Sequence, residues 1–589
     1  MNVIGISGLH NSVSFKKRQL PDLSTRDYRI VQGLDSAAAL VTCEEVVAAA
    51  AEERFSREKG TGSFPYHAIR YCLQAGGLTP KDVDYIAHGF SYEPFRSLFE
   101  NHENDFVRAQ FSQVYSRDAQ LRWLEESFPL GDWSKKFFPV SHHLAHAAST
   151  FYLSGFEESL ILVVDGMGEL DSTTVAVGSK KDIKVVKRIR ALHSLGILYG
   201  VFTLYLGFDI NDGEYKVMGL APYGNSRRYF DQIMDLVHLQ NDGTYTIPVL
   251  FQNHTVREKE TYAGTLRLVA EKLGPPRVPG AEIAQHHMDI AAGLQNVLET
   301  SLMHVLRQSK RQNDQKNLCM AGGVALNCTA NSVIKRSRMF KNIFIQPAAG
   351  DDGSALGAAL YVQRARGDGL GARRMALPLW GPSFANDDIA YALYERRGCG
   401  FTYFERFDDL VRDIAQRINR GQIIGWFQGR MEFGPRALGS RSILGDPRDP
   451  GMRERINRLV KKREAFRPFA PAVTVEAASR YFEIANGEAT LYAHMLFVTQ
   501  VREQYRQHFP SITHVDGSAR VQTVAREDNA AFWSLLTEFG NLSGAPILLN
   551  TSFNVRGQPI VCTPSEAIDT FLLAGLDALA IGNYVVIRK

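Results

Sequence analysis

The sequence predicts an α/β protein with two domains, and three observations support this. The chain has 589 residues, more than a single hydrophobic core usually holds. Roughly its first 365 residues alternate strand-like and helix-like segments, the pattern of an α/β domain. From about residue 385 many arginines stand next to glycines, after a stretch rich in Gly, Pro and Arg. We therefore expect domains at 1–365 and 385–589, joined by a linker at 366–384.

The first domain carries a weak internal repeat. It opens on the apolar strand "NVIGISG", and "DSAAALVTCEEVVAAAAEERF" (35–55) then has the pattern of a hairpin. The segment "SLILVVDGMGELDSTTVAVGSKKDIKVVKRIR" (159–190) repeats the scheme of a strand, a small polar turn and further strands. Duplicated halves of this kind suggest an actin-like ATPase fold, which places nucleotide phosphates between the two polar turns.

Three further elements complete this domain. Residues 284–308 place apolar side chains at helical spacing, which predicts a long helix. The segment "KNLCMAGGVALNCTANSVI" (316–334) predicts a strand, a Gly-Gly turn and a helix. "KNIFIQPAAGDDGSALGAALYV" (341–362) predicts a strand, a polar turn and a helix of small residues.

Composition excludes several classes of protein. The formal net charge of +4 is too small to favour nucleic acid, although clustered positive charges would suit anionic small ligands. The six cysteines form no CxxC pair, so neither a disulfide framework nor a zinc ribbon is indicated. No leader segment and no apolar stretch of about 18 residues appears, so we expect a cytoplasmic protein without membrane contact.

The stretch "VSHHLAHAAST" offers a candidate metal site. On a helix His142 and His146 share one face, which suits two imidazoles on one cation, although a core or capping role is the commoner explanation. Asp165 and Asp351 each follow an apolar strand at a glycine turn, where a carboxylate can project into a cleft, although aspartate is common in turns. Two histidines with carboxylates favour Fe(II), Mn or Zn over calcium.

A second group of residues suits a nucleotide. Gly322 and Gly323 allow close approach of the backbone to a ligand, and the following helix N-terminus can face phosphate. Asn327 and Asn331 lie one helical turn apart and could bond a base or ribose. Lys216, in a loop with two glycines, could meet a phosphate. The plain alternative is an ordinary turn and a solvated lysine.

The second half concentrates arginines among glycines and apolar residues. Guanidinium groups bind phosphate or carboxylate with two parallel hydrogen bonds, so this pattern predicts an anion pocket rather than a solvated basic face. No Walker or GxGxxG motif is present, which disfavours P-loop and Rossmann chemistry. The candidates are Arg430, Arg436, Arg441, Lys461, Lys462, Arg463, Arg467, Arg520 and Arg556.

Eight motifs taken in order carry a resemblance to a known family. They are "SHHLAHAAST", "VVDGMGE", "GEYKVMGLAPYG", "AGGVALNC", "GDDGSALGAAL", "FGPRALGSRSIL", "REAFRPFAPAV" and "NTSFNVRGQPIV". Together they resemble the nodulation/cephamycin/tobramycin-type O-carbamoyltransferases, over nearly the whole chain.

The resemblance implies a fold and a reaction. The N-terminal domain is expected to be actin-like, similar to the universal tRNA threonylcarbamoyl transferase. The C-terminal domain is expected to be α+β and YrdC-like, similar to threonylcarbamoyl-AMP synthase. There carbamoyl phosphate and ATP, with Mg, would give carbamoyladenylate. The carbamoyl group would then pass to a substrate hydroxyl in the N-terminal domain.

The resemblance also assigns residues. His142, His146, Asp165 and Asp351 correspond to the family's metal ligands, usually for iron, and His143 is not expected to bind. Asn327 and Asn331 fit the nucleotide pocket of the first domain, with Lys216, Gly322 and Gly323 nearby. In the second domain Arg436, Lys461, Arg467, Arg520 and Arg556 fit phosphate and carbamoyl recognition, and Lys461 and Arg467 rank highest as catalytic residues.

Two departures from the family pattern concern the base and an anion site. His10 follows the first strand and is the expected general base, but residues 13–34 look like an insertion that splits its motif, and a local turn bond is the alternative. We expect the insertion to influence acceptor choice. Gln558 stands where many relatives have Glu.

The expected partner is a small molecule whose hydroxyl accepts the carbamoyl group, such as a secondary metabolite or a sugar, and homodimer formation is an open alternative. Two rival interpretations remain: a non-catalytic, actin-like nucleotide-binding or regulatory protein, and a sugar-kinase-like phosphotransferase. Neither needs an arginine-rich second domain.

Overall fold

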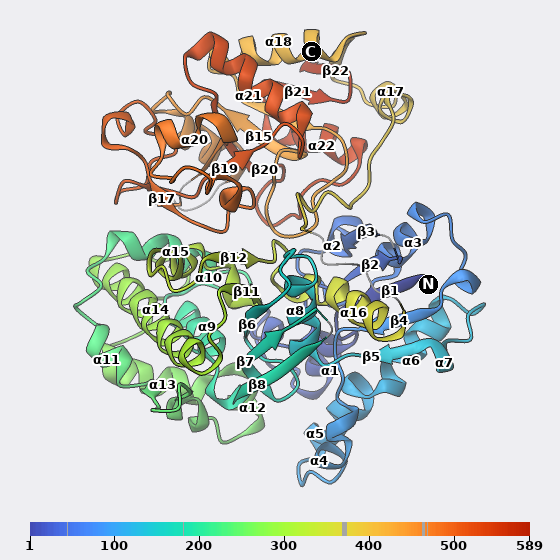
Figure 1. Ribbon diagram of the computed structural model, residues 1–589, viewed down its shortest axis with the longest axis vertical. Helices are drawn as coiled ribbons and strands as arrows, with labels where there is room; N and C mark the ends of the chain where they lie inside the picture. The colour runs from blue at the N-terminus through green and yellow to red at the C-terminus, as the bar shows by residue number, and fades with distance from the viewer. Residues whose placement is uncertain (44, 181, 368–373, 462–465, 468) are drawn as a thin grey trace. The chain divides into compact units, whose positions relative to one another are not determined.

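The computed structural model describes residues 1–43, 45–180, 182–367, 374–461, 466–467 and 469–589. The chain divides into two compact units (Figure 1). Unit 1 comprises Met1–Ser56 and Gly60–Met375, and unit 2 comprises Arg57–Lys59 and Ala376–Lys589. The boundary at Met375 falls inside the predicted linker, of which 368–373 lie outside the described residues. That a three-residue segment near the N-terminus groups with unit 2 was not predicted.

Unit 1 contains two five-stranded sheets of the same topology. Their strand orders are β3-β2-β1-β4-β5 and β12-β11-β6-β7-β8. In each sheet the first strand pairs antiparallel with the next strand along the chain and parallel with a later strand. This duplication confirms the predicted internal repeat. The strands are β1 (Val3–Ile6), β2 (Ala37–Val41), β3 (Val46–Ala51), β4 (Tyr85–His88), β5 (Phe137–Pro139), β6 (Ser159–Val164), β7 (Asp171–Gly178), β8 (Ile183–Arg190), β11 (Asn317–Ala321) and β12 (Asn342–Ile345).

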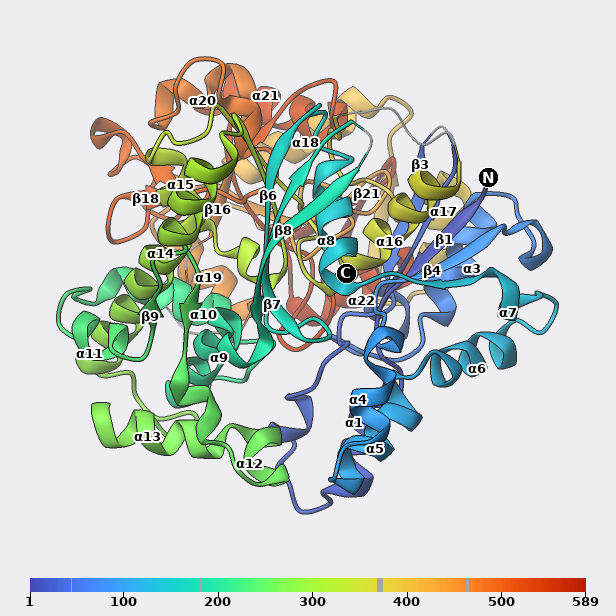
Figure 2. The same ribbon diagram turned by 60° about the horizontal axis from the view of Figure 1, so that its bottom comes forward.

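Two helices pack against each other between these sheets: α8 (His142–Phe151) and α16 (Asp351–Arg366) (Figure 2). α16 contacts β1, β2 and β4, while α8 contacts β6 and β11. Glycine at position 357 permits this close approach of the two helices, because a Cβ there would lie 1.8 Å from the Ala145 carbonyl oxygen. The packing brings together the first two turns of α8 and the first turn of α16, where three of the predicted metal ligands lie.

The predicted helix at 284–308 is confirmed as α14 (Gln285–Asn313). Its apolar stripe is buried as expected, at Ile290, Leu294, Val297, Leu298, Leu302 and Val305. The other helices of unit 1 are α1 (Ser12–Gln19), α2 (Glu53–Ser56), α3 (Tyr66–Ala75), α4 (Arg96–Glu100), α5 (Asp105–Gln110), α6 (Arg117–Ser127), α7 (Trp133–Lys136), α9 (Leu195–Tyr205), α10 (Glu214–Leu220), α11 (Phe230–Met234), α12 (Val256–Thr261), α13 (Ala263–Leu273) and α15 (Cys328–Arg336). None of the helices in the described ranges is long and apolar enough to cross a membrane.

The predicted insertion at 13–34 is folded against the second half of unit 1. It contains most of α1 and a short 3-10 helix. The buried Lys16 amine pairs with Glu260, which belongs to α12, at 3.2 Å. Arg26 pairs with Asp209 at 3.1 Å. The segment therefore ties the two halves of unit 1 to each other.

Unit 2 is built on an eight-stranded mixed sheet, in the order β13-β22-β21-β14-β15-β20-β16-β19. Its strands are β13 (Cys399–Tyr403), β14 (Ile424–Phe427), β15 (Arg441–Gly445), β16 (Ala470–Thr474), β19 (Gln522–Val524), β20 (Ile547–Ser552), β21 (Ala578–Ile581) and β22 (Tyr584–Arg588). Its helices are α17 (Asn386–Tyr394), α18 (Phe407–Asn419), α19 (Met452–Ile456), α20 (Val475–Tyr481), α21 (Ala530–Ser543) and α22 (Pro564–Ala574).

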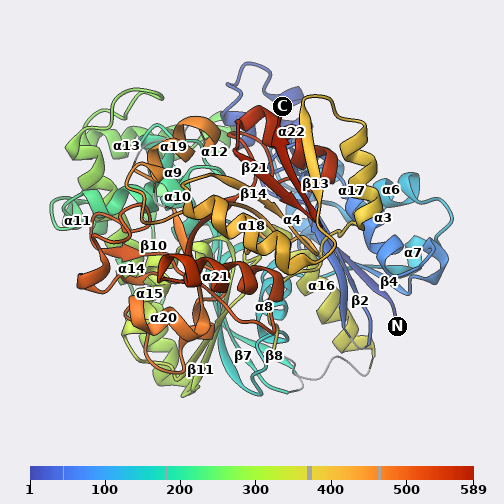
Figure 3. The same cartoon turned by 90° about the horizontal axis from the view of Figure 1, so that it is seen from above.

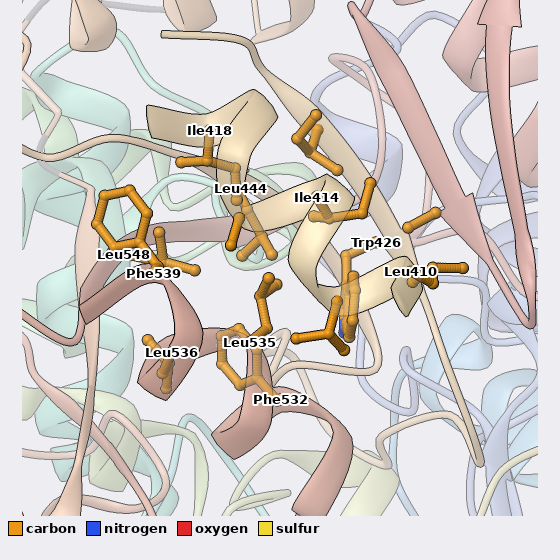
Figure 4. Packing of buried hydrophobic residues seen from close by; sticks show 14 of the residues in the cluster. Leu410, Ile414, Ile418, Trp426, Leu444, Phe532, Leu535, Leu536, Phe539 and Leu548 are labelled. Carbon is orange, nitrogen blue, oxygen red and sulfur yellow. The ribbon is translucent and has the colours of Figure 1, made fainter. Parts of the chain in front are cut away.

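The core of unit 2 lies between this sheet and two helices, α18 and α21, which run side by side (Figure 3). Leu410, Ile414 and Ile418 recur every fourth residue along α18 and so point to one side. They pack with Trp426 and with the aromatic and leucine side chains of α21 (Figure 4). The Trp426 indole N–H donates to the Gly439 carbonyl at 3.0 Å, so the loop before β15 is anchored to this core.

Candidate functional sites

The four predicted metal ligands converge in unit 1. His142 and His146 lie on the first two turns of α8, Asp165 follows β6, and Asp351 begins α16. One ligand atom from each residue lies within 4.8 Å of the other three. His142 Nε2 is 3.1 Å from His146 Nε2, 3.2 Å from Asp165 Oδ2 and 3.4 Å from Asp351 Oδ1. His146 Nε2 is 3.9 Å from each of the same two oxygens.

These separations fit one divalent transition metal. Bonds of about 2.0–2.2 Å place neighbouring ligand atoms about 3.0–3.4 Å apart, and opposite ones about 4.2 Å apart. The two Nε2 atoms that face each other cannot both carry a proton, whereas a cation between them satisfies both lone pairs. Two nitrogen and two carboxylate oxygen donors suit Fe(II), Mn or Zn.

The His142 ring is held in the orientation that a ligand needs. Its Nδ1 lies 2.9 Å from the Gly89 carbonyl, which can only accept, so Nδ1 carries the proton and the Nε2 lone pair faces the cluster. The Phe90 ring stacks on the imidazole at 4.0 Å and 12°. Nδ1 of His146 is buried and has no hydrogen-bond partner in the part of the chain that the structure describes.

The electrostatics of the cluster favour positive charge. Burial alone would lower the pKa of His142, but the Asp351 and Asp165 carboxylates outweigh it and raise that pKa well above the usual value. Burial and the neighbouring His142 charge lower the pKa of His146. Burial would raise the pKa of Asp165, yet the hydrogen bond from His142 lowers it. The two carboxylates thus stabilise positive charge at His142 Nε2, and either a proton or a metal cation can supply that charge.

His143 turns away from this cluster, as expected for a non-ligand. Its Nδ1 bonds the Thr174 hydroxyl, on β7, at 2.7 Å. Burial lowers its pKa to about 3, so the ring stays neutral.

The Gly-Gly turn lies directly beside the cluster. Gly322 has a φ of +90°, and a Cβ there would lie 2.3 Å from the Val164 carbonyl oxygen, so only glycine fits. The Gly323 N–H donates to Asp165 Oδ1 at 3.0 Å. The turn therefore fixes the side chain of the predicted ligand Asp165. It also places the start of the 3-10 helix Gly323–Leu326 next to the Asp165 carboxylate.

The other nucleotide candidates have local partners. Asn327 caps α15 by accepting from the Ala330 N–H, and its amide pairs with Gln295. The Asn331 amide donates to the Ala325 carbonyl at 2.8 Å. The Lys216 amine lies 5.5 Å from the centre of the Phe208 ring. Their roles in nucleotide binding stay predictions.

His10 lies in the turn that follows β1 and accepts a hydrogen bond. Its Nδ1 takes the Phe64 backbone N–H at 2.8 Å, and its ring meets Trp123 edge-on at 4.0 Å. The partner lies 54 residues away in the sequence, so this is not the local turn bond of the alternative interpretation, and the role of His10 stays a prediction. Because Nδ1 accepts, the neutral ring carries its proton on Nε2, and the lone pair available to a base is the one that Phe64 now occupies. Burial lowers the pKa of His10, which keeps the ring neutral at pH 7 as a base must be.

Four of the predicted anion-binding arginines of unit 2 lie in loops along one edge of its sheet, the edge formed by the ends of neighbouring strands. β15 and β16 run antiparallel to β20, so both begin where β20 ends, and β19 starts beside β16 because these two strands are parallel. Loops before β15, β16 and β19 and after β20 thus share one edge. They carry the predicted anion-binding residues Arg436, Arg467, Arg520 and Arg556.

These arginines differ in their surroundings. Arg520 Nε is buried without a hydrogen-bond partner among the described residues, and Arg556 is exposed. The side chain of Lys461 and the whole of Lys462 and Arg463 lie outside the described residues. Arg441 is fully buried and donates to the carbonyls of Gln428, Gly429, Ser440 and Pro382, so it supports the fold rather than a pocket.

A buried carboxylate that sequence reasoning missed organises the loop before β15. Glu432 Oε1 accepts the backbone N–H groups of Leu438 at 2.8 Å, Ser440 at 2.7 Å and Arg441 at 3.1 Å. This folds the loop that carries Arg436 around one side chain. The lone acidic residue in "GRMEFGPRALGSRSIL" was the available signal.

Comparisons with known proteins agree with this two-part arrangement. Residues 31–360 match the family model "Carbamoyltransferase N-terminus", and residues 415–588 match "Carbamoyltransferase C-terminus". An uncharacterized protein of Synechocystis sp. is 40% identical, over 94% of this chain and 95% of its own. Nodulation protein NolNO of Sinorhizobium fredii is 39% identical, over 100% and 83%. Nodulation protein NolO of Bradyrhizobium diazoefficiens is 42% identical, over 76% and 79%.

Full-length HypF with bound phosphate and nucleotide is a distant structural match at 11% identity and a TM-score of 0.32, too weak to bear on fold or function. The two family matches together span both units, and the relatives align over most of their lengths. The chain therefore belongs to the carbamoyltransferase family.

Proposed function

We propose that the protein is an ATP-dependent O-carbamoyltransferase with two sites. Unit 2 makes carbamoyladenylate from carbamoyl phosphate and ATP, and unit 1 transfers the carbamoyl group to a hydroxyl of a small acceptor. The observation that carries the proposal is the presence, in separate units of one carbamoyltransferase chain, of a His₂Asp₂ cluster and of four arginines at one sheet edge. The repeated sheets support an actin-like unit 1, and we assign unit 2 to the YrdC-like fold.

The arginine-bearing edge suits the first half-reaction. ATP and carbamoyl phosphate are both polyanions, so a site for the two must overcome their mutual repulsion. Guanidinium groups from four loops do this and bind phosphate oxygens in pairs. Water cleaves carbamoyl phosphate to phosphate and carbamate, a carbamate oxygen then bonds the α-phosphorus of ATP-Mg, and pyrophosphate leaves. We assign Lys461 and Arg467 to this step, with Arg436, Arg520 and Arg556 in phosphate binding.

The cluster in unit 1 suits the second half-reaction. A divalent metal held by His142, His146, Asp165 and Asp351, which we propose to be Fe(II), supplies Lewis acidity for a phosphate or an oxyanion. His10 takes the proton of the acceptor hydroxyl, and its lowered pKa leaves the ring neutral before the reaction. The ring lone pair is on Nδ1, so the hydroxyl must replace the Phe64 N–H from which Nδ1 accepts in this structure. The hydroxyl oxygen bonds the carbamoyl carbon, and AMP leaves. The segment at 13–34 starts beside His10, so we assign it to acceptor choice.

Two variants separate the half-reactions. Purified protein receives carbamoyl phosphate labelled in the carbamoyl carbon, ATP and Mg²⁺, together with a panel of sugars and other small alcohols. We expect Arg467→Ala to lose both carbamoyladenylate and transfer, and His142→Ala to lose transfer while carbamoyladenylate still forms. Transfer at the wild-type rate by His142→Ala would refute the role of the cluster. Exchange of segment 13–34 for a shorter one should change acceptor preference and leave carbamoyladenylate formation intact.

A further inference from the structure

Glu169 is a buried carboxylate in the loop between β6 and β7, four residues after the predicted ligand Asp165. Its side chain is 7% exposed. Oε1 accepts the backbone N–H of His142 at 2.8 Å and that of Ser91 at 2.7 Å. Oε2 lies 3.5 Å from the Ser141 hydroxyl. Glu169 is not one of the four clustered ligands, so it acts on the cluster only through other residues.

The bonds of Glu169 close a ring around the His142 imidazole. The carboxylate fixes the backbone of His142 at one point and the backbone of Ser91 at another. Two residues before Ser91, the Gly89 carbonyl accepts from His142 Nδ1, and between them Phe90 stacks on the ring. One carboxylate oxygen thus fixes the segment that donates the Nδ1 proton and the segment that accepts it.

Glu169 also replaces a missing helix cap. Ser141 occupies the N-cap position of α8 but makes no side-chain cap bond. The first N–H groups of a helix have no partner within the helix, and a carboxylate there is favoured by the helix dipole. Here that carboxylate comes from the loop that carries Asp165. Glu169 therefore connects the start of α8, which carries His142, to the β6–β7 loop, which carries Asp165.

We propose that Glu169 is a positioning residue that sets the place and orientation of the His142 imidazole, and through it the metal affinity of the cluster. This rests on the metal site of the proposed function. The position of Glu169 Oε1, which accepts the two backbone N–H groups, matters more for metal affinity than the negative charge of the carboxylate.

The test is titration of the full-length apoprotein with Co²⁺ alone, followed by the visible absorption of the bound ion. Loss of a residue that orients a ligand typically weakens metal binding about 10–100-fold, and we expect this for Glu169→Ala. Glu169→Gln keeps an acceptor oxygen at the same reach and should bind more tightly than Glu169→Asp, which withdraws it by one methylene. The absorption spectrum of Co²⁺ in Glu169→Ala should change, because the ligand geometry changes.

Glu52 provides a matched control. It is also buried and accepts the backbone N–H groups of His67 and Ala68 at the start of α3. Glu52→Ala should lower the melting temperature without changing the Co²⁺ spectrum. Wild-type affinity and spectrum in folded Glu169→Ala, or tighter binding by Glu169→Asp than by Glu169→Gln, would overturn the proposal. No Co²⁺ binding by the wild type would overturn both the metal site and this inference. Loss of Co²⁺ binding in His142→Ala would identify the cluster as the site that binds the ion.

Discussion

Replacement of Lys16 by methionine should loosen the segment at 13–34. The Lys16 side chain is 1% exposed, and its amine donates to the carbonyls of Ile30 at 2.7 Å and Glu260 at 2.6 Å. It also pairs with the Glu260 carboxylate. Burial lowers the pKa of Lys16 and raises that of Glu260, so both groups are largely shielded from water. Methionine keeps most of the apolar stem and removes the charge.

The free energy that Lys16→Met costs depends on the Glu260 carboxylate that remains without its partner. Removing one partner of a buried ion pair costs about 3–5 kcal/mol, because the other charge stays buried. The Glu260 side chain is 17% exposed, so water reaches it and the lower end, about 3 kcal/mol, applies. That equals about a hundredfold change in the opening equilibrium of the segment.

Hydrogen exchange followed by mass spectrometry measures this locally, since two units need not unfold together. In Lys16→Met, peptides from 12–34 should lose protection by about two orders of magnitude, while peptides from α18 and α21 stay unchanged. Lys16→Met combined with Glu260→Met should recover part of the protection, because no lone charge remains. Unchanged protection in the single variant would refute the view that this ion pair ties the two halves of unit 1.

Three further substitutions test the sites. His10→Ala should slow carbamoyl transfer about 10²–10⁴-fold and spare carbamoyladenylate formation. In the wild type, the neutral His10 ring is the base and burial lowers its pKa below 6.5. The rate of transfer should therefore fall only when the pH drops through that lowered pKa. Gly357→Ala should weaken metal binding measured by chelator competition, since its Cβ would push α16 away from the Ala145 carbonyl. Glu432→Ala leaves three N–H groups without their acceptor and should raise the KM for carbamoyl phosphate by displacing Arg436, whereas an unchanged KM would contradict this.

The sequence predicted the strands and the paired ligands because these depend on local patterns. The hairpins after β1 and β6 follow from apolar runs and polar turns, and the spacing of His142 and His146 places both on one helix face. Asp165 and Asp351 could be proposed because each follows a strand at a turn. Their meeting depends on the packing of α8 against α16, which no local pattern records.

Other roles depend on tertiary contacts that the sequence leaves open. Arg436 and Arg441 stand in the same glycine-rich stretch, yet Arg441 is fully buried among carbonyls. Asn327 was assigned to a nucleotide, but its side chain caps α15, a preference that its position before a helix already indicated. Glu169 bonds backbone groups, which are present at every residue and therefore give no sequence signal.

Formation of carbamoyladenylate tests the central claim most directly, and it needs no acceptor. Purified protein is mixed with ATP, carbamoyl phosphate and Mg²⁺, and carbamoyl-AMP and pyrophosphate are followed by mass spectrometry and a coupled assay. We expect both products from the wild type and from His142→Ala, and neither from Arg467→Ala. Absence of carbamoyl-AMP from the wild type, with ATP still bound, would contradict it.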